Sequence, residues 1–368
     1  MLRVAILWSI VVLSAACASP TAAPPPASGT TQTVSEWDQV LEAAKREGKV
    51  VVAGPAGADR KDALTQDFES RYGITVEYAG IPIRELLPRV HAERGSNQYL
   101  WDIYIGGTGT DLAEAVPTIF DPLEPALIRP EVKDLKQWRG DAYEFFDEGR
   151  RLMVMTPFQR GIIFVNPSLA SPDDFKSYRD LLDPKWRGKI VSDDPRTAGP
   201  GQATFTYFYM HPELGPDFIR ALGRQELSLL RDYGQEVDAV GQGRYPVLIG
   251  TSDAIVEQRM KQGVPIAIVD PRQLREGSDL SPAAGNVAIF NRAPNPNAAK
   301  VYVNWLLSKE GQTPFIQATG YISSRLDVTT EYALPWRVPI PGAVKTYTMQ
   351  AFETIPALNA LLEEVFGR

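Results

Sequence analysis

The feature that most constrains the fold is an alternation of short, β-branched apolar runs with segments of helical spacing. In the first half of the chain, residues 49–53, 74–78 and 101–105 are expected strands, and residues 59–71 and 86–93 are expected helices between them. Strands that alternate with helices in this way favour a mainly parallel sheet covered by helices.

The same alternation recurs in the second half of the chain. Strands are expected at 189–192, 245–250 and 265–269, with helices at 217–230 and 254–262. A chain of 368 residues is long enough for about two domains of ordinary size. The expected fold class is therefore α/β, with two lobes that each contain a mainly parallel sheet flanked by helices.

Two apolar runs lie where the chain would pass between these lobes. Residues 160–165 and 286–290 predict a two-stranded hinge. Asn295 and Pro296 then begin a helix by N-cap and N1-proline preference, and Gly311 is expected to end it. This helix would pack back on the first lobe. The expected division is a discontinuous lobe 1 made of 34–158 and 286–368, with 159–285 as lobe 2.

The first 33 residues carry the pattern of an exported protein. Arg3 precedes an apolar run over 4–13 and the small residues at 14–16, which together predict a signal peptide over 1–16. The run is shorter than the roughly 20 apolar residues of a membrane-spanning helix. Residues 17–33 are rich in Pro, Ala, Ser and Thr, and we expect them to form an extended tether.

Cys17 is the only cysteine of the chain, so the fold contains no intrachain disulfide. The run Leu13-Ser14-Ala15-Ala16-Cys17 resembles the lipobox of bacterial lipoproteins, in which the cysteine is acylated and becomes the new N-terminus. Ser14 stands where that pattern prefers Leu, and an ordinary secretory signal stays open as the alternative. The resemblance implies lipidation of Cys17 and a location outside the cytoplasm, anchored to a membrane in the periplasm or at the outer face of the cell.

Composition argues against several classes of protein. The net charge of −7, without long runs of like charge, gives no electrostatic footprint for nucleic acid. The sequence has only His91 and His211, and it lacks HExxH, phosphate-loop and GxSxG motifs. The carboxylate pair Asp193-Asp194 precedes Pro195, where turn formation explains it. We therefore do not expect an enzyme. An enzyme on the same fold and a structural surface protein stay open as alternatives.

Four loops that follow expected strands contain the candidate ligand-binding residues. In open α/β sheets, such loops lead into helix N-termini whose unpaired N–H groups bind ligands. Turn and cap formation is the ordinary explanation for each loop taken alone. The candidates are Gly54, Gly57, Asp59, Gly107, Thr108, Gly199, Gly201, Thr251, Ser252 and Asp253.

Three further side chains are candidates. Arg160, at the expected crossover, is suited to pair with a carboxylate or phosphate, with a surface arginine as the alternative. Tyr207 follows the Gly199–Gly201 loop and shares a helix face with His211. A Tyr–His metal pair is therefore one interpretation, and a packed aromatic beside a solvated histidine is the other.

Several segments resemble the extracellular solute-binding proteins of ABC importers, in the branch that binds ferric iron and small anions. The specific segments run from Asp180 to Ile190 (DLLDPKWRGKI), from Asn295 to Lys300 (NPNAAK) and from Ser308 to Gln312 (SKEGQ). The resemblance implies a periplasmic-binding-protein type II fold, in which two lobes close over a ligand by hinge motion.

The resemblance also implies a function. The chain would be a monomeric substrate-binding lipoprotein that delivers a small ligand to permease subunits, without a cofactor. Ferric-binding members hold the metal through adjacent tyrosines at a helix start that corresponds here to Thr251-Ser252-Asp253. These residues do not supply the phenolate oxygens that suit a hard trivalent metal. An organic or phosphorylated anion is therefore the expected ligand, with ferric iron (Fe³⁺) or an iron complex as the alternative.

Overall fold

The computed structural model describes residues 35–340 and 343–367, apart from the side chains of residues 110 and 111. The expected signal peptide, Cys17 and the expected tether lie outside the described residues. None of the helices in the described part combines the length and the apolar character that crossing a bilayer requires.

Lobe 1 is built on a six-stranded sheet in which β2, β1, β3, β13 and β4 are neighbours in that order and β5 also pairs with β13. The strands are β1 (Lys49–Gly54), β2 (Thr75–Gly80), β3 (Ile103–Gly106), β4 (Phe120–Asp121), β5 (Met153–Val154) and β13 (Asn286–Phe290). The helices of this lobe are α1 (Glu36–Glu47), α2 (Ala58–Tyr72), α3 (Ile83–Gly95), α4 (Thr110–Ile119), α5 (Pro130–Lys133), α10 (Pro296–Leu306) and α11 (Lys309–Thr319).

Lobe 2 is built on a five-stranded sheet in the order β11, β7, β10, β8, β9. The strands are β7 (Ile163–Val165), β8 (Ile190–Asp193), β9 (Ser228–Leu230), β10 (Val247–Ile249) and β11 (Ala267–Ile268). The helices are α6 (Pro200–Met210), α7 (Gly215–Gly223), α8 (Tyr233–Gly241) and α9 (Asp253–Lys261). The α/β fold class is thus confirmed. Both sheets are mixed, because β7 and β13 run antiparallel to their neighbours.

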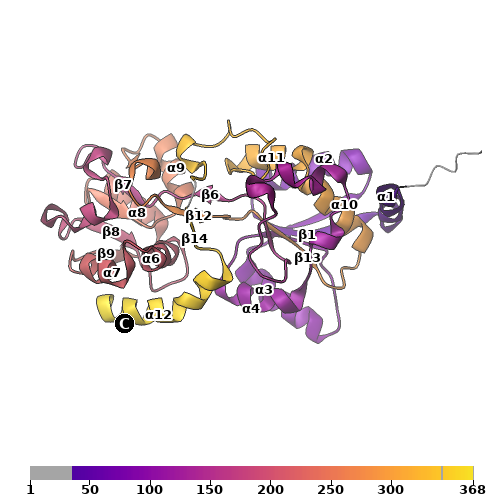
Figure 1. The fold of residues 1–368 in the computed structure, drawn as a ribbon, viewed down its shortest axis with the longest axis horizontal. Helices are drawn as coiled ribbons and strands as arrows, with labels where there is room; N and C mark the ends of the chain where they lie inside the picture. The colour runs from indigo at the N-terminus through magenta and orange to yellow at the C-terminus, as the bar shows by residue number, and fades with distance from the viewer. Residues whose placement is uncertain (1–34, 341–342, 368) are drawn as a thin grey trace, which may run out of the picture. The chain divides into compact units, whose positions relative to one another are not determined.

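A third, small sheet lies between the two lobes and is called the hinge sheet below (Figure 1). It consists of β6 (Phe158–Gln159), β12 (Asp279–Ser281) and β14 (Val344–Lys345). β6 and β12 pair antiparallel and carry the chain between the lobes, and β14 joins β12 in parallel. The apolar runs that were expected to cross, 160–165 and 286–290, instead contribute strands to the lobe sheets. β7 pairs with β10 and β11, and β13 pairs with β3 and β4, so strand pairing within each lobe holds them there.

The expected helix over 217–230 is wrong in its second half. Helix α7 ends at Gly223, Glu226 has a positive φ of 57°, and β9 begins at Ser228. β9 pairs in parallel with β8, which places it at the edge of the lobe 2 sheet. A tertiary strand pairing therefore overrides the local helical pattern.

The role expected for Gly311 is also wrong. Helix α10 ends at Leu306, and Gly311 lies in the first turn of α11. A Cβ atom at Gly311 would lie 2.2 Å from the carbonyl oxygen of Trp305. Glycine is needed here because the two helices approach closely, and not to end a helix. Gly48, in contrast, follows α1 with a φ of 75°, a backbone conformation that glycine adopts without strain.

The C-terminal segment, residues 344–366, contains β14 and helix α12 (Met349–Phe366). Figure 1 shows α12 in yellow near α6 and α7, and it contacts both of these lobe 2 helices as well as α4 of lobe 1. Leu358, Leu361 and Leu362 belong to the core of lobe 2. The expected division of the chain at 158/159 and 285/286 stays a prediction.

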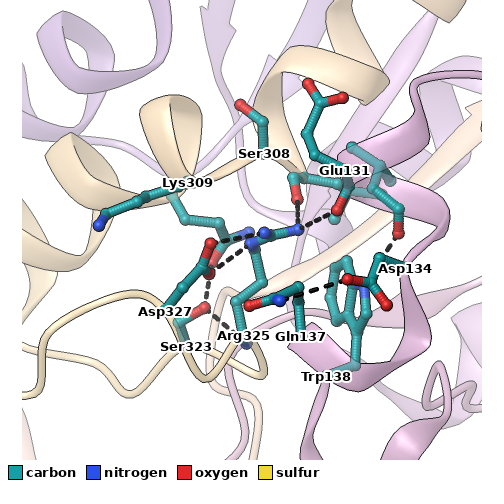
Figure 2. A network of polar contacts seen from close by, with 12 residues as sticks. Glu131, Asp134, Gln137, Trp138, Ser308, Lys309, Ser323, Arg325 and Asp327 are labelled. Carbon is teal, nitrogen blue, oxygen red and sulfur yellow. Dashed lines mark hydrogen bonds and ion pairs between the residues drawn. The ribbon is translucent and has the colours of Figure 1, made fainter.

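Arg325 fixes the segment that returns from α11 along lobe 1 (Figure 2). Its side chain is only 1% exposed, and Nε and Nη2 each donate to one carboxylate oxygen of Asp327 at 2.8 Å. Nη1 donates to the carbonyl oxygens of Glu131 and Leu307 at 3.1 and 3.3 Å. The guanidinium carbon lies 5.4 Å from the centre of the Trp138 ring. One buried cation therefore joins three parts of lobe 1.

We expect Arg325→Met to lower the free energy of unfolding by about 3 kcal/mol, because two buried carbonyl oxygens and Asp327 lose their partner. Urea denaturation measures the change. Arg187→Met is the matched control, since Arg187 pairs with Glu226 at the surface with both side chains more than 60% exposed. It should cost less than about 1 kcal/mol. Equal losses in the two variants would contradict this role for Arg325.

Candidate ligand-binding cleft

A cavity of about 410 Å³ is bounded by lobe 1, lobe 2, the hinge sheet and the C-terminal segment. This volume lies within the roughly 300–1,000 Å³ that is typical of small-molecule sites. Several chain segments that are far apart in sequence meet only here.

Three helix N-termini line the cavity. The start of α4 contributes Gly107, Thr108 and Gly109, the start of α6 contributes residues 198–200, and the start of α9 contributes residues 251–254. Each of these helices follows the end of a strand: β3, β8 or β10. The first turn of a helix leaves N–H groups without intrahelical partners, and its dipole favours negative charge. The cavity wall is therefore suited to an anion.

Asp193 and Gly201 hold the start of α6 in place. The amide of Gly201 donates to Asp193 Oδ2 at 2.7 Å, and a Cβ atom at Gly201 would lie 2.6 Å from the Asp193 carbonyl oxygen. Only glycine permits this approach. Burial raises the pKa of Asp193 to about 6. Gly201 thus supports the wall without being one of its lining residues.

Thr251 and Ser252 differ in what their hydroxyl groups do at the start of α9. Thr251 is buried and donates to Glu236 Oε2 at 2.5 Å, and burial raises the pKa of Glu236 to about 7. Ser252 is half-buried at the N-cap position, and its side chain makes no capping hydrogen bond. Ser252 therefore offers a hydroxyl group to a ligand at little cost to the helix.

Arg160 lines the cavity, but its guanidinium group is already engaged. Nη1 pairs with Asp279 Oδ2 at 3.2 Å, and Nη2 donates to Thr204 Oγ1 and the Pro200 carbonyl oxygen at 3.1 Å each. The residue thereby joins the hinge sheet to the start of α6. Its charge reaches the cavity largely balanced by Asp279.

Arg337 is a cavity residue that the sequence did not suggest. It ends the 3-10 turn Pro335–Arg337, donates to the Gly320 carbonyl oxygen at 3.2 Å, and pairs through Nη2 with Glu257 of α9. Its guanidinium carbon lies 4.9 Å from the centre of the Phe158 ring. Arg337 therefore links the lobe 1 tail to lobe 2 across the cleft. Nothing in the local spacing around it signals such a role.

Asp253 makes the charge of the cavity sensitive to pH. Its Oδ2 accepts a long hydrogen bond of 3.4 Å from the amide of Gly161. Burial raises the pKa of Asp253 to about 7, against the opposing effect of Arg160 and Arg337 and with a smaller contribution from Glu257. The carboxyl group therefore changes its charge near neutral pH.

Much of the remaining wall is apolar, and the sequence did not predict it. Tyr321 stacks on Phe158 with ring centres 5.0 Å apart, and both side chains line the cavity. The C-terminal segment adds Thr346, Tyr347, Ala351, Phe352 and Ile355. The sequence pattern of this segment does not show that it lines a cavity, because tertiary packing alone brings it there.

The structure brings most of the predicted ligand-binding residues to one place. Those that line the cavity are Gly107, Thr108, Arg160, Gly199, Thr251, Ser252 and Asp253. Gly54, Gly57 and Asp59 are not among the lining residues. A Cβ atom at Gly54 would lie 2.4 Å from the Tyr78 hydroxyl, so glycine there allows the ring to pack.

Tyr207 and His211 are placed for structural contacts. Tyr207 is fully buried in the core of lobe 2, and its hydroxyl donates to the Glu276 carbonyl oxygen at 2.8 Å. His211 Nδ1 accepts from the amide of Glu213 at 3.2 Å, and burial lowers the pKa of its ring. Among residues 35–340 and 343–367, no cluster of three or more His, Cys, Asp or Glu side chains is placed to hold a metal ion.

Solved structures share this architecture. A Trichodesmium protein in complex with iron and citrate is 16% identical, with a TM-score of 0.69, and the match covers 87% of this chain and 100% of the other. The periplasmic binding protein AfuA from Actinobacillus pleuropneumoniae, with fructose-6-phosphate bound, is 18% identical, with a TM-score of 0.58. The match covers 86% of this chain and 97% of AfuA. These likenesses confirm the expected two-lobe periplasmic-binding-protein fold.

Sequence comparison gives the family. An uncharacterized protein of Haemophilus influenzae is 26% identical over 286 residues, which is 74% of this chain and 77% of the relative. The model of the bacterial extracellular solute-binding proteins matches residues 63–336, which is more than half of the chain. The chain therefore belongs to the bacterial extracellular solute-binding protein family.

Proposed function

We propose that the chain captures a small organic or phosphorylated anion in this cavity and that the closed form presents the anion to a permease. The observation that carries the proposal is the convergence of three helix N-termini, from both lobes, on one cavity. A ligand that contacts α4 on one side and α6 and α9 on the other stabilises the closed state, because it binds that state better.

The balance of charge around the cavity supports an anion of low charge. Arg160 and Arg337 are each paired with a carboxylate, Asp279 and Glu257 respectively. The two guanidinium groups therefore contribute little net field, and the helix N-termini supply the remaining positive potential. The fructose-6-phosphate held by AfuA is an example of a phosphorylated anion on this fold.

Ferric iron, alone or as a complex, is the second candidate. Its support is the Trichodesmium structure with iron and citrate and the presence of Tyr321 and Tyr347 at the cavity wall. Tyr347, however, donates its hydroxyl to Glu144 at 2.7 Å, and Tyr321 is stacked on Phe158. These contacts favour the organic anion, and tyrosinate-to-iron absorbance in the visible range would instead favour iron.

We also propose that the mature protein is a lipid-anchored, non-catalytic monomer. The family places it outside the cytoplasm. The lipobox-like run ending at Cys17 supports the anchor, and the lack of hydrolase motifs in the sequence supports a binding role.

The direct test is a thermal-shift screen of the whole protein with carboxylates, phosphate esters, phosphonates and ferric salts. A ligand that binds only the folded state raises the melting temperature, by an amount that grows with its concentration. We expect shifts with members of the first three classes. Shifts with ferric salts alone would make ferric iron the preferred ligand in place of the organic or phosphorylated anion. Turnover of a substrate without any shift would reject the proposal.

Ser252→Ala should weaken an anion found in that screen about fivefold, since one hydrogen bond to the ligand is lost. Its effect on folding should be small, because Ser252 makes no capping bond. Ser308→Ala is the matched control: Ser308 caps α11 by accepting from the Gly311 amide at 3.4 Å and does not line the cavity. It should lower unfolding free energy by about 1 kcal/mol and leave affinity unchanged. Calorimetry and urea denaturation measure both; loss of affinity in Ser308→Ala alone would contradict the assignment.

Affinity for a carboxylate that stays ionised should rise roughly fivefold from pH 8 to pH 6. Over this interval Asp253, with its pKa of about 7, gains a proton and no longer repels the ligand. The neighbouring Arg160 and Arg337 keep their charge, whereas Glu236 behind Thr251 has a pKa of about 7 and gains a proton over the same interval. Asp253→Asn should therefore reduce the dependence and leave the part that Glu236 contributes. Titration calorimetry at the two pH values measures it. A wild-type affinity that rises with pH would show that another group controls binding.

A further inference from the structure

We infer that the C-terminal segment, residues 344–366, determines which ligands the cavity accepts, and that the preferred ligand is an anion with an apolar body. The inference rests on the proposed function and adds the chemical class of the ligand. The match to the family model ends at residue 336. The part of the cavity wall that residues 344–366 form therefore lies outside the matched part of the chain.

The side chains at the cavity come from one face of α12. Ala351 and Ile355 are four residues apart, and Phe352 and Ile355 are three apart, spacings that place them together on a helix surface. All three line the cavity, as does Tyr347 just before the helix. Phe352 and Ile355 are half-buried, so a ligand can cover surface that they still expose.

Contacts with both lobes hold this wall in position. On lobe 1, Phe352 meets Phe146 edge to face with ring centres 5.3 Å apart, and Tyr347 donates to Glu144. On lobe 2, Leu358 and Leu362 are fully buried in the core. A wall that is already ordered can bind a ligand without the entropy cost of ordering side chains.

The size of the cavity points to the same class of ligand. Its volume of about 410 Å³ greatly exceeds the roughly 30 Å³ that a water molecule occupies in the liquid. A compact anion at the helix N-termini would leave Phe352 and Ile355 in contact with water. An apolar body attached to the anionic group would displace that water and bury both surfaces.

Position 355 allows a test at constant shape, because Val and Thr are nearly isosteric. We would compare Ile355→Val and Ile355→Thr with two matched pairs of probes: benzoate against acetate, and phenyl phosphate against inorganic phosphate. Titration calorimetry on the whole protein gives the affinities. Wild type should prefer the aromatic member of at least one pair about tenfold, and that member should bind Ile355→Thr about fivefold more weakly than Ile355→Val. Compact anions should not distinguish the two variants.

The outcomes separate this inference from the proposed function. Equal affinity of wild type for the compact and aromatic members would overturn the inference and leave anion capture standing. Equal binding of the aromatic probe by the Val and Thr variants would show that α12 does not contact it, which also overturns the inference. Failure of all four anions to bind would reject anion capture and the inference together. The wild-type comparison needs no variant, so it holds even if a substitution disturbs folding.

Discussion

Arg160 and Asp279 form a buried ion pair at the point where the chain passes between its lobes. Arg160 follows β6, Asp279 begins β12, and the Arg160 amide also donates to the Asp279 carbonyl oxygen at 3.1 Å. Thr346 beside β14 donates to the same carboxylate at 2.8 Å, and the guanidinium reaches the first turn of α6 through the Pro200 carbonyl oxygen. Both crossings, the C-terminal segment and one wall of the cavity therefore depend on a single buried pair. Removing either partner would leave an uncompensated charge, which is costly in such surroundings.

The same pairing explains how the cleft can accept a negative ligand without excess positive charge. Each cavity arginine has its own carboxylate, so the field that remains comes from oriented backbone groups at helix starts. Those groups are fixed by the fold and need no reorganisation when a ligand arrives. Asp253 makes the electrostatic potential of the cavity dependent on pH, since its charge changes near neutrality. The proposed preference for an anion is therefore a property of the architecture more than of any single side chain.

Different parts of the chain supply the polar and the apolar surface of the cavity. Helix N-termini from the part that matches the family supply polar groups, and the segment after residue 336 supplies apolar surface. Such an arrangement would let α12 select the body of the ligand while the strand ends and helix starts hold its anionic group. It also makes the C-terminal segment a contact of both lobes, through Phe352 on one and Leu358 on the other.

The α/β alternation, the two lobes and the loops at Gly107, Gly199 and Ser252 could be predicted from the sequence, because periodicity, turn residues and caps are local signals. The sequence did not determine the strand β9, since an edge pairing with β8 decided that conformation. Nor did the sequence indicate Arg337 or Ile355, which belong to a tail whose place beside the cavity no local signal shows. These residues reach the cavity only because tertiary packing brings distant segments together. Gly311 is a further example. The sequence shows a glycine, but only the packed structure shows that the close approach of two helices requires it.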